Sequence, residues 1–547
     1  MKFIRPVLPP FDPSTWLQSP FPERAKAVCA SWATDGYGTP AVVFVAYGLK
    51  ILAYVWVWSL FCSLSPSLGP LSAIASWWAE PLALQKAILW SMLFEVLGLG
   101  CGSGPLTGRY RPPVGAPLYF LRRGTIRLPP LGAGRRRGML DVLLYAALLA
   151  ALLAVLTSPA VTTLGVLPVV VLLVLSGLRD RTIFLAARSE HYLVACLIFL
   201  LAGSTEAFVA GLMALWAALW FFAGFSKLNS HFAPVVCVMV SNSPMLCFAG
   251  LRKRMYRSYP DDLRPSGLAI ALGHFGTALE LSIPLVLLTA WSPGMLLLGM
   301  ALVVLLHGYI TTSVPVGVPL EWNVLVAYGA FVLFWGHPEV SVLQMSAPIA
   351  VLVLTTAVVV PLLGNLFPGR ISFLPSMRYY AGNWAMSVWL FRGDSHKKLY
   401  RSLTMPSPWV REQLGPFYDD ATITALLSRL MAFRLMHLHG RALGELLPQA
   451  LGEAPLSAYT WMDGEVIAGA VLGWNFGDGH LHGARLIEVI RAECDFAPGE
   501  LRCITVEAQP LLQRHQRYEI FDGADGLIGS GMLPVAALRE RQPWDQR

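Results

Sequence analysis

Ten runs of mostly apolar residues occupy most of the chain up to residue 366. A helix that crosses about 30 Å of hydrocarbon needs about 20 such residues. The runs are continuous, whereas the strands of a membrane barrel alternate apolar and polar residues, so a barrel is excluded. We therefore predict ten transmembrane helices, at 41–62, 82–100, 140–158, 161–178, 183–202, 207–225, 268–290, 294–313, 320–336 and 345–364.

The composition agrees with a membrane protein. Only 14% of the 547 residues are charged, against about 25% in soluble domains. Residues 1–370 contain 24 Lys and Arg against 14 Asp and Glu, and residues 371–547 contain 17 against 19. The basic excess therefore belongs to the apolar part and its loops, which argues against a nucleic-acid-binding surface.

The basic residues between the runs predict the orientation of the chain. The loop 101–139 carries eight arginines and no acid, and the loops 179–182 and 226–267 are also rich in basic residues. The intervening loops carry no Lys or Arg, at 63–81, 159–160, 203–206, 291–293 and 337–344. With ten spans every basic loop falls on one side, which the positive-inside rule assigns to the cytoplasm. Both chain ends are then cytoplasmic.

The predicted fold is an all-α polytopic membrane bundle of about ten helices with a small C-terminal cytoplasmic α+β domain. Its parts are an N-terminal cytoplasmic segment (1–40), the transmembrane helical domain (41–366) and the C-terminal domain (377–547). In the last of these, 421–447 and 484–494 have helical patterns, and 465–474 and 501–508 have strand patterns.

Ionisable residues inside the apolar runs are candidates for function. A charge at the bilayer centre costs about 3 kcal/mol, so such residues must face protein or a cavity. Lys50, Lys86 and Arg188 can be explained by side chains that reach the membrane surface or by internal ion pairs. Glu95 stands just before a glycine-rich stretch and can equally pair with a lysine.

The stretch AGFSKLNSHF (223–232) offers a candidate base. Lys227 stands beside an apolar helix end, and burial would depress the pKa of its amine. The alternative is a lysine that complements the helix C-terminus and faces the cytoplasm. Asn229 and His231 follow it and are candidate substrate-binding residues.

Further candidates come from the next runs. His274 and Glu280 are six residues apart and about 120° apart around a helix, so only a wide cavity takes both. Pro319 interrupts the helical pattern after His307. Irregular backbone at membrane depth is found where it lines a cavity or is buried in protein. The predicted pocket residues there are His307, Glu321, Trp322 and Asn323.

The C-terminal stretch GDGHLHG (477–483) contains an HxH pattern. On a strand, His480 and His482 would project from one face, as a metal site requires. Asp478 and Glu507 are candidates for a third ligand. The alternative is a polar turn without metal.

The whole chain resembles an uncharacterised family of bacterial multi-pass membrane proteins, a domain-of-unknown-function family. The stretches that carry this resemblance include LRRGTIRLPP (121–130), GLRDRTIFLAARSE (177–190), YPDDLRP (259–265), VGVPLEWN (316–323) and VLGWNFGDGHLHGARL (471–486). The resemblance implies a multi-pass protein of the bacterial inner (plasma) membrane and supplies no reaction.

A second, shorter resemblance covers about 200–310. AGFSKLN (223–229), followed by GHFGTALELSIPLVLL (273–288), is similar to the HTTM superfamily, which includes vitamin K-dependent gamma-glutamyl carboxylases and is related to DoxX-like membrane proteins. In the carboxylases the lysine of the matching segment acts as the base on the hydroquinone, which would be Lys227 here. The large carboxylase-type C-terminal region has no recognisable counterpart in this chain.

Two functions remain open at this point. The first is an intramembrane enzyme or redox-active protein that acts on or binds a quinone- or lipid-like molecule, with Lys227 as base or charge partner. The second is a non-enzymatic transporter or lipid-binding scaffold whose cytoplasmic domain docks a partner. The expected partners are the lipid bilayer and an apolar small molecule, with no nucleic acid.

Overall fold

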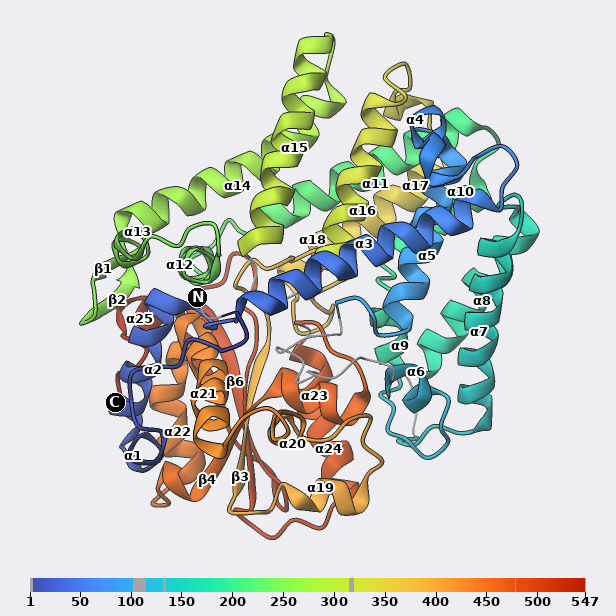
Figure 1. Cartoon of the computed structure of the whole chain (residues 1–547). Coiled ribbons are helices and arrows are strands. Elements are labelled where there is room, and N and C mark those ends of the chain that lie inside the picture. The colour runs from blue at the N-terminus through green and yellow to red at the C-terminus, as the bar shows by residue number, and fades with distance from the viewer. Residues whose placement is uncertain (1–2, 102–114, 131–133, 314–318, 478, 547) are drawn as a thin grey trace.

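The computed structural model describes residues 3–101, 115–130, 134–313, 319–477 and 479–546. Figure 1 shows the long helices, coloured blue to yellow, above an orange-to-red C-terminal part that contains a sheet. Six of the ten predicted spans are confirmed as helices long and apolar enough to cross a membrane. They are α3 (Ala41–Ser63), α7 (Met139–Thr157), α11 (Thr205–Phe225), α14 (Gly267–Leu288), α15 (Pro293–Ser313) and the run Ala347–Leu366, which comprises α17 (Ala347–Val353), the π-helical η5 (Leu354–Val359) and α18 (Val360–Leu366).

The other four predicted spans are shorter or broken helices, and their crossing of a membrane stays a prediction. They are α5 (Pro81–Val96), α8 (Thr163–Arg179), the pair α9 (Arg181–Ala186) and α10 (Tyr192–Leu201), and α16 (Leu320–Ala330) with its π-helical continuation η3 (Phe331–Trp335). The prediction of one helix over 183–202 is wrong. Residues 187–191 form a turn in which Arg188 takes a left-handed conformation with φ 48°.

Loops that the sequence left unassigned also contain helices. The segment 226–267 holds the apolar α12 (Phe232–Asn242), α13 (Ala249–Arg254) and a hairpin of β1 (Tyr256–Ser258) and β2 (Asp262–Pro265). Short helices elsewhere are α1 (Pro13–Gln18), α2 (Phe21–Asp35), α4 (Ile74–Trp77) and α6 (Gly115–Phe120).

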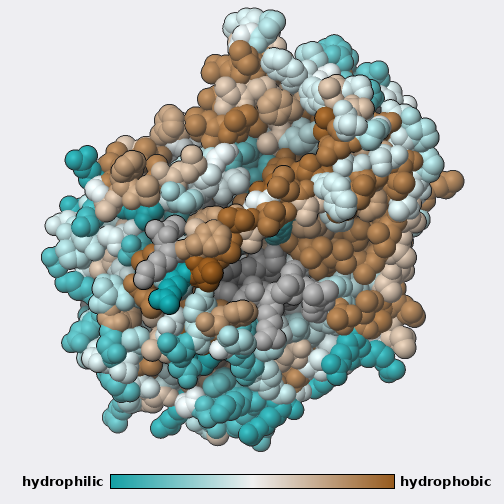
Figure 2. Space-filling view, viewed as in Figure 1, coloured by the Kyte–Doolittle hydropathy of each residue, from teal (hydrophilic) through white to brown (hydrophobic). Residues whose placement is uncertain are grey.

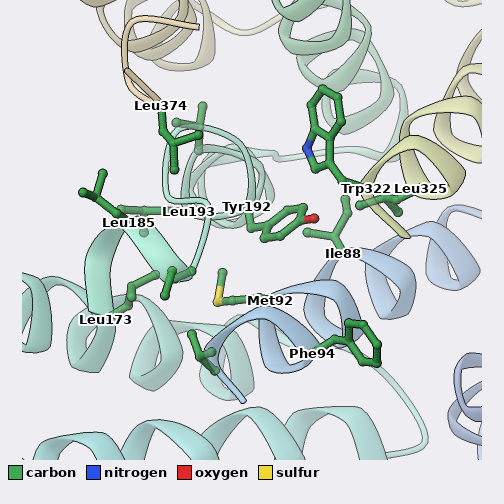
Figure 3. Close-up of a cluster of buried hydrophobic side chains, with 14 of the residues drawn as sticks. Ile88, Met92, Phe94, Leu173, Leu185, Tyr192, Leu193, Trp322, Leu325 and Leu374 are labelled. Atoms are coloured by element: carbon green, nitrogen blue, oxygen red, sulfur yellow. The ribbon is translucent and has the colours of Figure 1, made fainter. Parts of the chain in front are cut away.

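The long helices bury one side and expose leucines on the other. Figure 3 shows Ile88 and Met92 of α5 beside Tyr192 of α10 and Trp322 of α16, in a core that extends through the bundle. On the outside, Leu49 and Leu52 of α3 are 61% and 66% exposed. In Figure 2 hydrophobic residues gather over the long helices and hydrophilic residues over the C-terminal part. Exposed apolar faces of this kind are typical of helices that face lipid.

The C-terminal part is built on a five-stranded antiparallel sheet with the order β4-β3-β5-β6-β7. The strands are β3 (Met386–Arg392), β4 (Tyr459–Asp463), β5 (Leu501–Val506), β6 (His515–Asp522) and β7 (Gly526–Pro534). The helices around it are α19 (Lys397–Ser402), α20 (Val410–Leu414), α21 (Asp420–Met436), α22 (Leu443–Leu451), α23 (Gly464–Leu472), α24 (Ala484–Glu493) and α25 (Val535–Glu540).

Both faces of this sheet are covered, because side chains alternate along a strand. Val388 and Leu390 of β3 belong to a core that includes α2, α12, α21 and α22. Trp389 and Phe391 belong to the other core, with α23 and α24, which continues into the long helices. The sheet therefore connects the two cores of the molecule.

Strand 501–508 and helix 484–494 are confirmed, but the strand prediction for 465–474 is wrong. Asp463 caps α23, since its side chain accepts a hydrogen bond from the Glu465 N–H at 2.9 Å. Gly473 ends the helix in a left-handed conformation with φ 81°. An Asp before and a Gly after an apolar stretch are helix signals, and the periodicity of the stretch masked them.

The single helix expected over 421–447 is divided. α21 ends at Met436, a 3₁₀ turn covers His439–Ala442, and α22 follows. Gly440 makes this corner possible, because a Cβ there would lie 1.9 Å from the carbonyl oxygen of Arg434.

The basic loops lie on the side of the C-terminal part. Arg136 Nε donates to Glu493 Oε2 at 2.9 Å, and Arg264 Nη1 lies 3.2 Å from Glu540 Oε2. The N-terminal α2 packs against α21, and Figure 1 shows both chain ends beside α2, on the side of the C-terminal part. The stretches 119–130, 134–137 and 256–264 and the N-terminal helices thus share one side of the long helices.

Candidate functional site

A cavity of about 520 Å³ lies where the membrane-type helices meet the C-terminal part. Its lining side chains are mostly apolar or aromatic. From the helices they include Leu219, Trp220, Val236, Met239, Leu272, Phe275, Leu279, Leu306 and Ile310. From the C-terminal part they include Phe373, Tyr379, Tyr380, Trp384, Phe433, Glu465 and Phe476. The cavity therefore belongs to both parts of the chain.

One wall of this cavity reaches the outer surface along α14. Leu272 and Phe275 line the cavity and are nevertheless 38% and 62% exposed. Leu268, one turn earlier, lines it and is 42% exposed. This wall of the cavity is therefore also part of the exposed apolar surface of α14.

The predicted base, Lys227, lines the cavity and is paired with an acid. Its ammonium forms an ion pair with the Glu280 carboxylate of α14, and their side chains are 8% and 5% exposed. Gly224 brings α11 close enough to α14 for this pair, because a Cβ there would lie 2.9 Å from Leu281 Cγ. The ring of Phe232 lies 5.3 Å from Nζ. Lys227 must pass a proton to Glu280 before its amine can accept one from a ligand.

His307 lines the cavity, but its two nitrogens are occupied. Trp220 Nε1 donates to its Nε2 at 3.0 Å, so that nitrogen is the acceptor. Its Nδ1 therefore carries the proton and donates to Asn323 Oδ1 at 2.7 Å. The Asn323 amide in turn donates to the Pro319 carbonyl at 2.7 Å. This chain fixes a neutral imidazole and makes His307 an organising residue rather than a free base.

Arg188 contributes a buried cation, and of the two alternatives from the sequence the structure shows the internal ion pair. Its guanidinium lies 4.7, 5.3 and 5.5 Å from the ring centres of Trp322, Tyr379 and Phe476. Nε donates to Glu190 Oε1 at 2.8 Å. A non-glycine residue in the left-handed region costs about 1 kcal/mol or more and is enriched at functional sites. Here the strained conformation turns the Arg188 side chain toward the cavity.

Glu321 does not line this cavity, contrary to the sequence-based prediction. Its carboxylate lies 3.2 Å from Lys50 Nζ, away from the neighbouring Trp322. Glu95 and Cys101 complete a buried group in which ligand atoms of all three acidic or thiol side chains lie within 4.8 Å of one another. These donors suit a divalent cation such as zinc, while the ammonium of Lys50 already balances one carboxylate.

The remaining predicted residues near Lys227 are divided between two places. Asn229 and His274 line a second cavity, on the other side of Lys227. His231 instead turns into the C-terminal part, where its Nε2 lies 3.0 Å from Gln509 Oε1. Burial lowers the pKa of His231 to about 4. His231 is therefore a neutral residue of the interface between the two parts, and no cavity described here includes it.

The HxH pattern does not form a common face. His480 belongs to the 3₁₀ turn Gly479–Leu481 and not to a strand, which agrees with the alternative of a polar turn. His480 Nε2 lies 3.0 Å from Glu507 Oε2, whereas His482 Nδ1 lies 2.8 Å from Ser387 Oγ. Asp478 lies outside the described residues. Among the described residues the two imidazoles do not belong to a common group of candidate metal ligands.

Sequence reasoning missed the C-terminal contribution to the cavity. Tyr380, Trp384, Phe433 and Phe476 are aromatic residues of a domain with ordinary composition. Tyr380 has φ 45°, so two of the four non-glycine residues with positive φ among those described line this cavity. No spacing in the sequence connects these residues to Lys227.

Comparison with known proteins places the chain in a family. No curated protein and no solved structure matches it. A family model described as a transmembrane protein of unknown function (DUF3556) matches residues 1–547, which is the full length given. The apolar helices, the exposed leucines and this match agree, and the chain belongs to the DUF3556 family of transmembrane proteins.

Proposed function

We propose that the protein binds an apolar, lipid- or quinone-like molecule in the 520 Å³ cavity between its helices and its C-terminal part. The observation that carries this proposal is the wall along α14, where Leu272 and Phe275 face both the cavity and the outer surface. Burial of apolar surface contributes about 0.8 kcal/mol for each methylene. A long hydrocarbon or isoprenoid chain therefore gains most from this site.

The polar groups of the cavity support binding of a mainly apolar molecule. Lys227 is paired with Glu280, and His307 with Asn323 and Trp220. Because Lys227 and His307 already have protein partners, a ligand need not supply hydrogen bonds to these two groups. Arg188, Tyr380 and Trp384 keep polar atoms without a partner among the described residues, and these atoms could bind one polar end of the ligand.

A reaction on the bound molecule is the second candidate function. It is favoured by the position of Lys227 on the cavity wall beside a carboxylate that can take its proton. The neutral amine would then remove a proton from the ligand, as a general base does. A transporter or a scaffold that docks a protein partner is the remaining alternative from the sequence.

We place the protein in the bacterial plasma membrane, with the C-terminal part and the N-terminal segment in the cytoplasm. Support comes from the arginine-rich stretches 121–130 and 134–137, which lie on the side of the C-terminal part. The positive-inside rule assigns such stretches to the cytoplasm.

The binding proposal is tested by mass spectrometry of lipids that co-purify with the full chain in detergent. Gly276 lines the cavity, and the nearest atom to a Cβ there is Phe232 Cε1 at 3.9 Å. Gly276→Leu should therefore fill the cavity and remove the co-purifying molecule. Ala278→Leu, on the exposed face of the same helix, is the matched control. Equal lipid content in both variants would refute the proposal.

The reaction is tested separately with Lys227→Gln. We expect the variant to retain the co-purifying molecule while its chemical turnover is lost. A variant that still converts the molecule would leave binding as the function.

A further inference from the structure

A second cavity, of about 490 Å³, adjoins the first one. Lys227 and Phe232 line both cavities. The second cavity lies between the first half of α14, the β1–β2 hairpin and the C-terminal part. Its other lining residues include Asn229, Pro234, Arg257, Arg264, Ile270, His274, Arg441 and Arg539. The side chains of Lys227 and Phe232 thus form a wall between an apolar cavity and a basic one.

The second cavity carries more positive charge than its acids balance. Five of its lining residues are Lys or Arg, and Glu540 is the only acid among the described lining residues. Lys227 is paired with Glu280, and Arg264 with Asp262 and Glu540. The other three cations form no ion pair with an acid in the described parts of the chain; they are Arg257, Arg441 and Arg539. Asp262 acts on Arg441 only from beyond ion-pair distance.

Arg441 is the strongest indication of a ligand. It is 1% exposed, and its Nε has no hydrogen-bond partner. Its Nη1 donates to the carbonyl oxygens of Arg541, at 2.9 Å, and Arg539, at 3.5 Å. A buried charge with no acid within ion-pair distance is costly. An anion in the cavity that Arg441 lines would remove that cost.

The position of the basic cavity indicates which anion it takes. It lies at the N-terminal end of α14, next to the basic residues of α13 and β1. There the long helices meet the hydrophilic C-terminal part. Guanidinium groups match the oxygens of phosphate. A phosphate held here would lie next to the wall shared with the apolar cavity.

We propose that the ligand is an anionic amphiphile, with a phosphate-containing headgroup in the basic cavity and its apolar chain in the adjoining 520 Å³ cavity. This inference rests on the proposed function and adds the class of headgroup. Arg441 holds the phosphate from the buried side, and Arg257 and Arg539 hold it from the exposed side.

The test compares ligands that share tails and differ in the headgroup. The full chain in detergent is titrated with dioleoylphosphatidylglycerol and with dioleoylglycerol, and bound lipid is counted by native mass spectrometry. The variant is Arg257→Gln/Arg539→Gln, because both side chains are exposed. The charge-matched control, Arg254→Gln/Arg401→Gln, changes two exposed arginines outside the cavity.

We expect phosphatidylglycerol to bind the unmodified chain more tightly than dioleoylglycerol. Each arginine near a membrane surface contributes about a fivefold change in affinity for anionic lipid, so the variant should bind it about 25-fold more weakly. Binding of dioleoylglycerol should be unchanged in the variant, and both affinities should be unchanged in the control.

The outcomes separate this inference from the proposed function. Equal affinity for the two lipids, or equal loss in the variant and the control, would overturn the headgroup assignment while binding in the apolar cavity stands. If neither lipid binds, both the headgroup assignment and the binding of a lipid in the apolar cavity are overturned. The last measurement adds millimolar inorganic phosphate to the full chain. If phosphate alone stabilises the chain, the variant loses this effect and the two lipids bind equally, the ligand is a soluble anion and not a lipid headgroup.

Discussion

Acidification should destabilise the protein through a histidine of the C-terminal part. His437 is fully buried, and its Nδ1 donates to the Phe433 carbonyl at 2.6 Å, while Nε2 has no partner. Burial lowers the pKa of His437 to about 3, against about 6.5 in an unfolded chain. The folded protein keeps this imidazole neutral at pH 5, where the unfolded chain protonates it.

The sign and the size follow from the two pKa values. Because the folded pKa is the lower one, the unfolded state binds more protons as the pH falls below 6.5, and stability is lost through that window. Between pH 7 and pH 5 the loss from His437 is about 2 kcal/mol in the free energy of unfolding. Burial raises the pKa of Glu465 to about 7, which acts in the opposite direction. The contribution of His437 must therefore be measured by comparing the pH dependence of stability in the unmodified chain and in a variant that lacks this histidine.

The assay is chemical unfolding of the full chain in detergent micelles at pH 7 and pH 5, followed by circular dichroism. We compare the unmodified chain with His437→Leu, which cannot titrate. The loss of stability between the two pH values should be about 2 kcal/mol smaller in this variant. His515→Gln, at an exposed histidine, should leave the loss unchanged. An identical pH dependence in the unmodified chain and His437→Leu would refute the reasoning.

Three further changes have expected outcomes in the same unfolding assay. Lys227→Met leaves the Glu280 carboxylate buried without its partner and should cost about 3 kcal/mol, and Lys227→Met/Glu280→Leu should recover part of it. Asp463→Asn weakens a buried pair in which Arg434 donates at 2.9 Å to each carboxylate oxygen, and should cost about 3 kcal/mol. Gly440→Ala forces a Cβ against a backbone carbonyl and should cost about 1–3 kcal/mol or prevent folding.

Two of these changes, Asp463→Asn and Gly440→Ala, have a control with the same substitution at an exposed or uncrowded position. Asp394→Asn breaks an exposed ion pair with Lys397 and should cost less than about 1 kcal/mol. Gly415→Ala meets no atom closer than 3.5 Å. An ion pair makes the loss of stability in the double variant smaller than the sum of the losses in the two single variants. A double variant that loses as much as that sum, or more, would contradict the assigned pair of Lys227 and Glu280.

The sequence predicted the elements that depend on local pattern. Apolar runs of sufficient length gave α3, α7, α11, α14 and α15 nearly to the residue, because hydrocarbon thickness sets their length. Pattern failed where tertiary contacts decide. The turn at 187–191 is held by the Arg188–Glu190 pair and the aromatic rings around it, which come from residues more than 100 positions away.

The candidate site was predictable only in part, for the same reason. Lys227, Glu280, His307 and Asn323 were identified because polar residues in apolar runs are conspicuous. Glu321 was misplaced, since the direction of a side chain on α16 depends on packing against Lys50. The aromatic wall from the C-terminal part carries no such signal in the sequence.

The shared core of the N-terminal helices and the sheet has a consequence for biosynthesis. Trp32 of α2 packs against Phe433 of α21, with ring centres 5.8 Å apart. A ribosome makes α2 long before α21, and all the long helices emerge in between. The first helices must therefore wait, with their apolar faces uncovered, until insertion is complete and the end of the chain arrives. The core shared by α2 and α21 therefore forms only after both ends of the chain have been synthesised.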